Sequence, residues 1–272
     1  MLSFLTSDKM PSYRAKAIIL KSYKLGESDK IIKMYSQKDG IISAVARGSR
    51  KIKSKFGGRL ELFNFVDLEL ATGRNLDIIT QAEILRSFKN IPLDFNKFIL
   101  CELISEIILK TQSTGIEVSH LLFKLIYVCF NEIDGLAAGD AGAIKKAACF
   151  FGAKFLKIIG FCPIINNCGK CGSDIGFFNS TLQRNILFSI KNGGVICQQC
   201  IKSSGENLEV RILTVENHKF LNDLFHKKLR DFRNIEVSQE SISKIYKLLG
   251  DYIEYHTECS VDSFDYLNKI VV

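Results

Sequence analysis

The chain contains no long hydrophobic run. No stretch of it reaches the roughly eighteen consecutive apolar residues that a membrane-spanning helix requires, so we expect no membrane span. The first nine residues also lack the apolar core and the cleavage-site pattern of a secretion signal. We therefore expect residues 1–10 to form a short leader that is disordered or loosely docked, with Met10 as an alternative start.

Signatures of catalysis are missing as well. The sequence has no P-loop, no G-x-S-x-G motif and no dinucleotide fingerprint, and its carboxylates form no compact pair typical of a nuclease. The triplet from His256 to Glu258 has the H-x-E form of zinc deaminases. Those enzymes place a P-C-x-x-C motif after the triplet, whereas here the cysteine pairs come before it. We predict that the protein is not an enzyme and uses no nucleotide cofactor.

The composition is that of an ordinary globular protein. Hydrophobic residues make up 47% and charged residues 24% of the 272 residues, which is compatible with roughly one to three domains with a real core. The charge is uneven. Residues 1–95 contain 17 Lys and Arg against 10 Asp and Glu, whereas residues 96–272 contain 20 against 19. The first third is therefore the candidate binding module, and the nearly neutral remainder is the scaffold.

Most of this excess charge lies in one stretch. Residues 47–59, called the basic segment below, contain six cations and no acidic residue: Arg47, Arg50, Lys51, Lys53, Lys55 and Arg59. The stretch is flanked by strand-like sequence and is expected to be a flexible loop that builds no core. Nucleic-acid phosphate is its natural partner, although solvated charge runs and targeting patches have the same composition. If all six cations contact one single strand, log affinity falls against log salt with a slope of about −4.

Single-strand binding also uses aromatic side chains on which bases stack. The candidates near the basic segment are Tyr35, Phe56 and Phe63. We favour Phe56 because it lies inside the basic run, whereas the apolar neighbours of Phe63 predict a place in the core.

The first ninety residues alternate in the manner of β-strands separated by glycine-bearing turns. Five strands are expected at residues 13–22, 31–36, 41–46, 60–71 and 76–85. This pattern favours a five-stranded β-barrel of the OB type, a fold that binds single-stranded nucleic acid. An SH3-like barrel or a sandwich has a similar strand count and stays open as an alternative.

After Pro92 the apolar residues follow a helical period instead. Helices are expected at residues 95–108, 121–130, 143–159, 214–229 and 238–256, with Gly160 as a stop and Thr214 as an N-cap. The fold class is therefore α+β with several domains. Residues 11–90 form the barrel, residues 91–160 and 207–272 an α-helical bundle, and residues 161–206 a small insert.

The insert carries two C-x-x-C pairs, made by Cys168, Cys171, Cys197 and Cys200. Two intervening residues let both thiolates of a pair face one ion, so the four are predicted to bind one structural Zn²⁺ with no open position for catalysis. The alternative is a vestigial site or a set of reduced buried thiols. Cys101, Cys129 and Cys149 are expected in the helical core, and Cys162 is expected to be a small buried residue.

Three groups of short sequence stretches occur in a characteristic order along the chain. Residues 17–20 (Ala-Ile-Ile-Leu) precede residues 26–29 (Gly-Glu-Ser-Asp). Residues 44–55 read Ala-Val-Ala-Arg-Gly-Ser-Arg-Lys-Ile-Lys-Ser-Lys, and residues 160–163 (Gly-Phe-Cys-Pro) precede the cysteine pairs. From about residue 13 onward, this order resembles the RecO family of bacterial DNA repair and recombination mediators.

The resemblance implies a non-catalytic mediator of recombinational repair with an OB barrel, a helical domain and a zinc module. It implies binding of single- and double-stranded DNA, annealing of complementary strands, and help in loading recombinase onto strands coated by single-strand binding protein. The implied partners are a RecR-type protein and the C-terminal tail of single-strand binding protein. The implied location is the bacterial cytoplasm, at the nucleoid. By the same likeness, the six cations of the basic segment are the DNA contacts.

The residues alone also allow one further function. Barrels and zinc knuckles are also common in RNA-binding and ribosome-associated zinc proteins. The two hypotheses differ in the nucleic acid that the basic segment binds.

Overall fold

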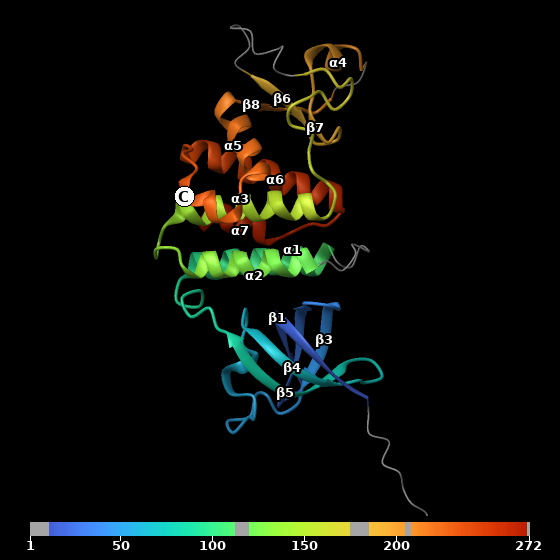
Figure 1. Ribbon diagram of the computed structural model, residues 1–272, viewed down its shortest axis with the longest axis vertical. Helices are drawn as coiled ribbons and strands as arrows, with labels where there is room; N and C mark the ends of the chain where they lie inside the picture. The colour runs from blue at the N-terminus through green and yellow to red at the C-terminus, as the bar shows by residue number, and fades with distance from the viewer. Residues whose placement is uncertain (1–10, 112–119, 175–184, 205–207, 271–272) are drawn as a thin grey trace, which may run out of the picture. The chain divides into compact units, whose positions relative to one another are not determined.

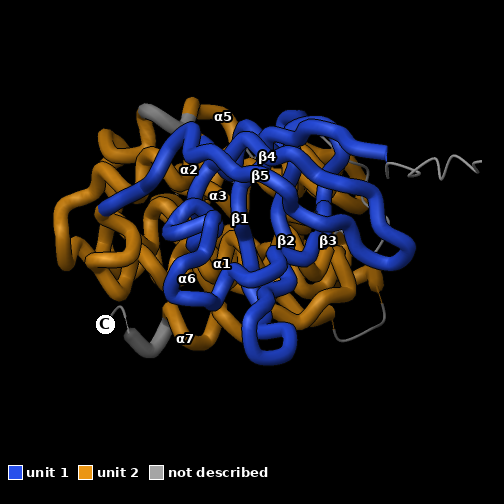
Figure 2. Tube along the Cα trace, turned by 90° about the horizontal axis from the view of Figure 1, so that it is seen from below, with its two compact units in different colours: residues 1–89, 117–127 blue, residues 90–116, 128–272 orange. Residues whose placement is uncertain are grey.

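The computed structural model describes residues 11–111, 120–174, 185–204 and 208–270. The chain divides into two compact units, shown in Figure 2. The barrel unit comprises residues 1–89 and 117–127, and the helical unit comprises residues 90–116 and 128–272. Within the described ranges, no helix is both long enough and apolar enough to span a bilayer.

The barrel unit is a closed five-stranded barrel (Figure 1). Its strands are β1 (Ser12–Leu25), β2 (Asp29–Ser36), β3 (Gly40–Ala46), β4 (Phe65–Ala71) and β5 (Asp77–Arg86). Hydrogen bonding joins them in the order β1-β2-β3-β5-β4, and β4 pairs back onto β1. The neighbouring strands are antiparallel except for β3 and β5. This is the OB-like architecture, so the leading prediction is confirmed over the SH3-like barrel and the sandwich.

Closure depends on the long first strand. The N-terminal half of β1 pairs with β4, and its C-terminal part pairs with β2. The register with β2 shifts between Ile19 and Lys21, which bends the strand so that it serves both partners. Alternate residues point inward and fill the barrel with apolar side chains, among them Ile32, Met34, Ile42, Ala44, Val66 and Leu68.

The fourth strand starts later than the sequence predicts. Residues 57–60 form a 3₁₀ helix, η1 (Gly57–Leu60), and β4 begins at Phe65. Between them, Phe63 adopts a left-handed backbone with φ of 69°. The Asn64 side chain donates hydrogen bonds to the carbonyls of Gly58 and Arg59. The apolar content of residues 60–64 therefore reflects buried turn residues and not a strand.

The helical unit is built around α3, which packs against α1, α5 and α6, while α7 packs on α1. The bounds are α1 (Phe95–Thr111), α2 (His120–Asp134), α3 (Ala141–Ile158), α5 (Val215–His226), α6 (Gln239–Thr257) and α7 (Ser263–Ile270). The two units divide α2 between them. The five expected helices are confirmed, including the N-cap at Thr214 and the left-handed Gly160 after α3. Helix α7 was missed because its eight residues are too few to establish a period.

A small three-stranded sheet lies in the cysteine-bearing part of this unit. Its strands are β6 (Ile186–Ser189), β7 (Gly194–Val195) and β8 (Arg211–Leu213), in the order β7-β6-β8. Gly194 is required at the end of the β6–β7 hairpin, because a Cβ there would lie 2.2 Å from the carbonyl oxygen of Ile164. Helix α4 (Gln198–Lys202) follows the hairpin and carries Cys200, the last cysteine of the two C-x-x-C pairs.

Candidate nucleic-acid interface and metal centre

The basic segment follows β3 and folds into consecutive turns. The backbone N–H of Lys51 donates to the carbonyl of Gly48 at 3.2 Å, and that of Ser54 donates to the carbonyl of Lys51 at 2.9 Å. Gly48 has φ of +65°, a conformation that glycine adopts without strain. The stretch therefore has a defined turn structure, and the expectation that it builds no core is wrong, because Phe56 lies in the barrel core.

One arginine ties the basic segment to the turn between β1 and β2. The Nη1 atom of Arg50 donates to the carbonyls of Gly26 and Glu27 at 3.0 and 2.9 Å. The backbone N–H of Arg50 also donates to the carbonyl of Ser28 at 2.9 Å. The guanidinium therefore holds two loops together at one end of the barrel.

A carboxylate completes this junction. Asp29 accepts a hydrogen bond from the backbone N–H of Gly48 at 2.8 Å and another from the hydroxyl of Ser28 at 2.7 Å. These hydrogen bonds, assisted by the charges of Arg47 and Lys51, lower the pKa of the Asp29 carboxyl. Asp29, the first residue of β2, thus fixes the start of the basic segment.

The aromatic side chains expected to stack on bases are all buried. Phe56 is 2% exposed and belongs to the barrel core together with Leu60. Tyr35 is fully buried, and Phe63 is 1% exposed. The core position of Phe63 is confirmed. The stacking roles considered for Tyr35 and Phe56 are wrong, because neither ring is accessible and Phe56 instead plugs the barrel.

The six cations of the basic segment separate into two groups. Lys55 donates to the carbonyl of Thr80 at 2.8 Å, and Arg59 donates to the carbonyls of Lys55 and Phe56 at 3.3 and 3.2 Å. Together with Arg50, these cations bind backbone carbonyls of the barrel itself.

The second group, called the exposed triad below, is Arg47, Lys51 and Lys53. All three are exposed, and none forms a side-chain hydrogen bond or an ion pair with any residue that the structure describes. Ile52, between two members of the triad, is fully solvent-exposed as well. The triad therefore offers three charges and one apolar side chain to an external partner.

An accessible aromatic residue lies on the barrel wall at the same end. Tyr23 of β1 is 45% exposed, and the Nζ atom of Lys33 on β2 lies 5.9 Å from its ring centroid. In the register, Tyr23 faces Ile31, and Ile31 faces Val45, two residues before the basic segment. The sequence interpretation missed Tyr23 because it ended the first strand at residue 22. Extending the alternation by three residues would have found it.

The four predicted metal-ligating cysteines converge in the helical unit. The Sγ atoms of Cys168, Cys171, Cys197 and Cys200 all lie within 4.8 Å of one another. The Cys171 and Cys197 sulfurs are 3.8 Å apart. Four sulfurs at the usual Zn–S distance on a tetrahedron would be separated by about 3.8 Å. The donor set and its spacing therefore fit one Zn²⁺.

The surrounding hydrogen bonds support negative charge on three of these sulfurs, whereas burial raises the pKa of the Cys200 thiol to about 12. The N–H of Cys197 donates to the sulfur of Cys168, and the N–H of Cys200 donates to that of Cys197, both at 3.4 Å. Hydrogen bonds from the hydroxyl and backbone N–H of Ser173 lower the pKa of the Cys171 thiol to about 6. Four adjacent thiols can all ionise only when a cation balances them, and a bound divalent metal supplies that charge.

The remaining cysteines and the H-x-E triplet lie outside this cluster. Cys101, Cys129 and Cys149 are buried as expected. Cys162 is exposed, so the prediction of a buried residue there is wrong. His256 pairs through Nε2 with the carbonyl oxygen of Ile190 at 3.0 Å. Among the described residues, no histidine or carboxylate joins the four-cysteine cluster.

Two known family models together match most of the described fold. The model for the N-terminal part of recombination protein O matches residues 10–88, and that for its C-terminal part matches residues 92–263. A protein of Desulforamulus reducens named DNA repair protein RecO is 30% identical over 261 residues, 96% of each chain.

Two other proteins of the same name are similar to this chain. The protein of a Nocardioides species is 35% identical over 191 residues, 69% of this chain and 74% of the relative. The protein of Pelotomaculum thermopropionicum is 28% identical over 260 residues, 96% of this chain and 95% of the relative. The chain therefore belongs to the recombination protein O family of DNA repair proteins.

Proposed function

We propose that this protein is a non-catalytic mediator of recombinational repair. It binds and anneals DNA strands, and it helps to load recombinase onto strands coated by single-strand binding protein. The observation that carries the proposal is the exposed triad, which three hydrogen-bonding anchors hold at one end of an OB-like barrel. Phosphates are the ligands that three cations without internal partners favour.

A single strand would contact this end of the barrel through two kinds of group. Arg47, Lys51 and Lys53 bind the phosphates, and a base stacks on the ring of Tyr23, whose neighbour Lys33 adds positive charge. Arg50, Lys55 and Arg59, which the sequence also assigns to DNA, act mainly as anchors, because their donors already bind carbonyls. The salt slope from the basic segment is then about −2 and not −4.

DNA is favoured over RNA as the ligand. The relatives carry the name DNA repair protein, and no feature of the described residues favours a ribosomal or RNA partner. Family membership also supports the two protein partners, a RecR-type protein and the C-terminal tail of single-strand binding protein. It likewise supports a location in the bacterial cytoplasm at the nucleoid.

The four-cysteine cluster serves a structural role in this proposal. One Zn²⁺ held by Cys168, Cys171, Cys197 and Cys200 would cross-link the loops of residues 161–206, a module whose own core is small. Four thiolates leave no coordination position for water or substrate. The cluster therefore stabilises the fold and contributes no chemistry to DNA.

Strand annealing without ATP tests the proposed function. Two complementary DNA oligonucleotides are mixed with the protein, and duplex formation is followed by fluorescence quenching between end labels. The protein should accelerate pairing over the spontaneous rate, and added nucleotide should change nothing. A rate equal to the spontaneous one would contradict the proposal. A parallel reaction with complementary RNA strands separates the two nucleic-acid hypotheses.

A further inference from the structure

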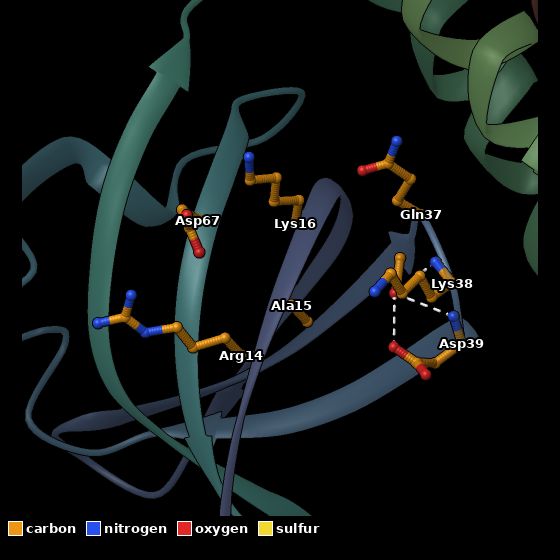
Figure 3. A pocket seen from close by; sticks show the side chains of 8 residues that line it. Arg14, Ala15, Lys16, Gln37, Lys38, Asp39 and Asp67 are labelled. Carbon is orange, nitrogen blue, oxygen red and sulfur yellow. Dashed lines mark hydrogen bonds between the residues drawn. The ribbon is translucent and has the colours of Figure 1, made fainter.

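A second group of cations surrounds a depression at the opposite end of the barrel. The depression has a volume of about 320 Å³ and is formed by β1, β4 and the turn between β2 and β3 (Figure 3). We call it the hairpin depression. Its polar lining comprises Arg14, Lys16, Ser36, Gln37, Lys38, Asp39 and Asp67.

Three cations of this lining have no internal partner. Arg14, Lys16 and Lys38 are exposed, and their side chains form no hydrogen bond or ion pair with the described part of the chain. Lys16 is directly opposite Asp67 in the β1–β4 register, yet the two side chains are not paired. Figure 3 shows Arg14 and Lys16 rising from β1 and Lys38 rising from the hairpin turn. Such a group creates positive potential in a concave surface, where an anion is favoured.

The framework of the depression is fixed by hydrogen bonds. The backbone N–H of Gln37 donates to the carbonyl of Lys16 at 2.9 Å. The buried hydroxyl oxygen of Ser36 accepts the N–H groups of Lys38 and Asp39 at 3.2 and 3.1 Å. The same hydroxyl donates to the Asp39 carboxylate at 2.9 Å. One of the two carboxylates in the lining is thus already engaged within the turn.

The hairpin depression and the basic segment are far apart on one rigid strand. Lys16 borders the depression, and the carbonyl of Gly26 binds Arg50 of the basic segment. Lys16 and Gly26 are ten positions apart along β1 and the turn that follows it, which corresponds to at most roughly 30 Å because the strand bends. An oligonucleotide shorter than this separation cannot contact both ends, so each end can hold a short strand of its own.

We propose that the hairpin depression is a second phosphodiester-binding site, which holds the backbone of a second DNA strand while the basic segment holds the first. This inference rests on the proposed annealing function, because pairing requires two strands on one protein. Arg14, Lys16 and Lys38 bind the phosphates. Asp67 repels phosphate from the β4 side and limits the affinity of the site.

Binding stoichiometry tests the site separately from annealing. Short oligo(dT) strands cannot pair with one another, so their binding reports sites alone. Wild-type protein should bind two strands per chain. The combined Arg14→Gln, Lys16→Gln and Lys38→Gln variant should bind one, because losing three phosphate contacts weakens a single-strand site roughly 100-fold at 0.1 M salt. Asp67→Asn should strengthen the weaker of the two sites.

The matched control removes three exposed cations of the helical unit, Lys202, Lys244 and Lys247, by the same change to Gln. It should bind two strands, as wild type does, and thermal unfolding should show that both triple variants are folded. If the hairpin variant binds as many strands as the control, the second site is overturned.

Annealing rates separate this inference from the proposed function. The hairpin variant should retain its first strand and anneal complementary strands more slowly than the control. Wild-type protein that fails to anneal contradicts the proposed function, while the oligo(dT) stoichiometry still decides the second site. Annealing by wild type together with two strands bound by the hairpin variant contradicts only the second site.

Discussion

In the helical unit, buried and half-buried lysines donate hydrogen bonds to backbone carbonyls, whereas in the barrel unit the exposed triad has no such partner. Lys97 is 3% exposed, and its Nζ atom donates to the carbonyls of Asp134 and Leu136 at 3.2 and 2.7 Å. Lys154 donates to the carbonyl of Phe225 at 3.0 Å, and burial lowers its pKa to about 8. A lysine can therefore serve the fold, as Lys97 does, or face solvent, as Lys51 and Lys53 of the exposed triad do.

This difference shows that a charge count alone does not locate a binding surface. Residues 96–272 contain 20 cations, more than the barrel has, yet those just described are used inside the fold. What marks the barrel is the exposed triad, a group of cations on one anchored loop that lack internal partners. Removing the triad should therefore affect DNA binding, whereas removing a buried lysine such as Lys97 should affect stability.

The largest expected effect is loss of the metal centre in the helical unit. Cys168→Ser removes a buried ligand, and apparent binding free energies of structural zinc are about 10–16 kcal/mol in zinc-finger peptides. Zinc measured in chelator-free preparations should fall from one ion per chain to nearly none, with a lower melting temperature. Cys162→Ser, outside the cluster, should retain both. Equal zinc contents in the Cys168→Ser and Cys162→Ser variants would contradict the assignment of the four-cysteine cluster as the zinc site.

The next effect tests the lysine that serves the fold. Lys97→Met leaves the carbonyl of Leu136 without its donor and removes one of two donors to the carbonyl of Asp134, which should lower the free energy of unfolding by about 2 kcal/mol. Affinity for single-stranded DNA should not change, because the amine is inaccessible. Urea unfolding and a DNA titration on the same preparation measure both quantities. Lys202→Met, at an exposed position, should change neither the free energy of unfolding nor the affinity for DNA. A loss of DNA affinity in the Lys97→Met variant would contradict the claim that this lysine serves only the fold.

A smaller effect is expected from the exposed aromatic ring of the barrel. Replacing Tyr23 with Ala should weaken single-stranded DNA binding by about 1–3 kcal/mol, the usual contribution of one stacked base. The matched variant Tyr266→Ala removes an exposed ring from the helical unit and should bind normally. Fluorescence anisotropy with a labelled oligonucleotide measures both affinities. Equal affinities would place the stacking surface elsewhere.

The smallest effect distinguishes an anchor from a phosphate contact. Arg50→Gln loosens the junction with Gly26 and Glu27 and should weaken DNA binding only a few-fold. Its salt slope should stay close to that of wild type, because a lost phosphate contact would change the slope by about 0.7. A full change of that size would mean that Arg50 contacts DNA directly.

Much of the fold could be predicted because its signals are local. Strand alternation and turn glycines predict the five strands of the barrel, and the apolar period predicts the long helices. Paired C-x-x-C spacing predicts the cysteine cluster, because neighbouring residues determine where each pair of sulfurs points. Short elements such as α7 and β8 lack enough residues to show a period, so they were missed.

The candidate interface was predicted in outline and not in detail. The charge of residues 47–59 is visible in the sequence, but whether each cation is free depends on carbonyls far along the chain. Lys55 binds the carbonyl of Thr80, and Arg50 binds that of Gly26. In the sequence, Phe56 stands among polar residues and is interpreted as an exposed ring. In the structure, its ring is buried in the core of the barrel. Only the tertiary structure distinguishes cations and aromatic rings that stabilise the fold from those that are free to bind a ligand.

The salt dependence of single-stranded DNA affinity tests the central claim most directly. Wild type is compared with the combined Arg47→Gln, Lys51→Gln and Lys53→Gln variant, and with the Lys202, Lys244 and Lys247 control. The account predicts that the exposed-triad variant loses about 2 from the magnitude of the slope of log affinity against log salt, whereas the control matches wild type. Parallel lines for wild type and the exposed-triad variant would contradict it.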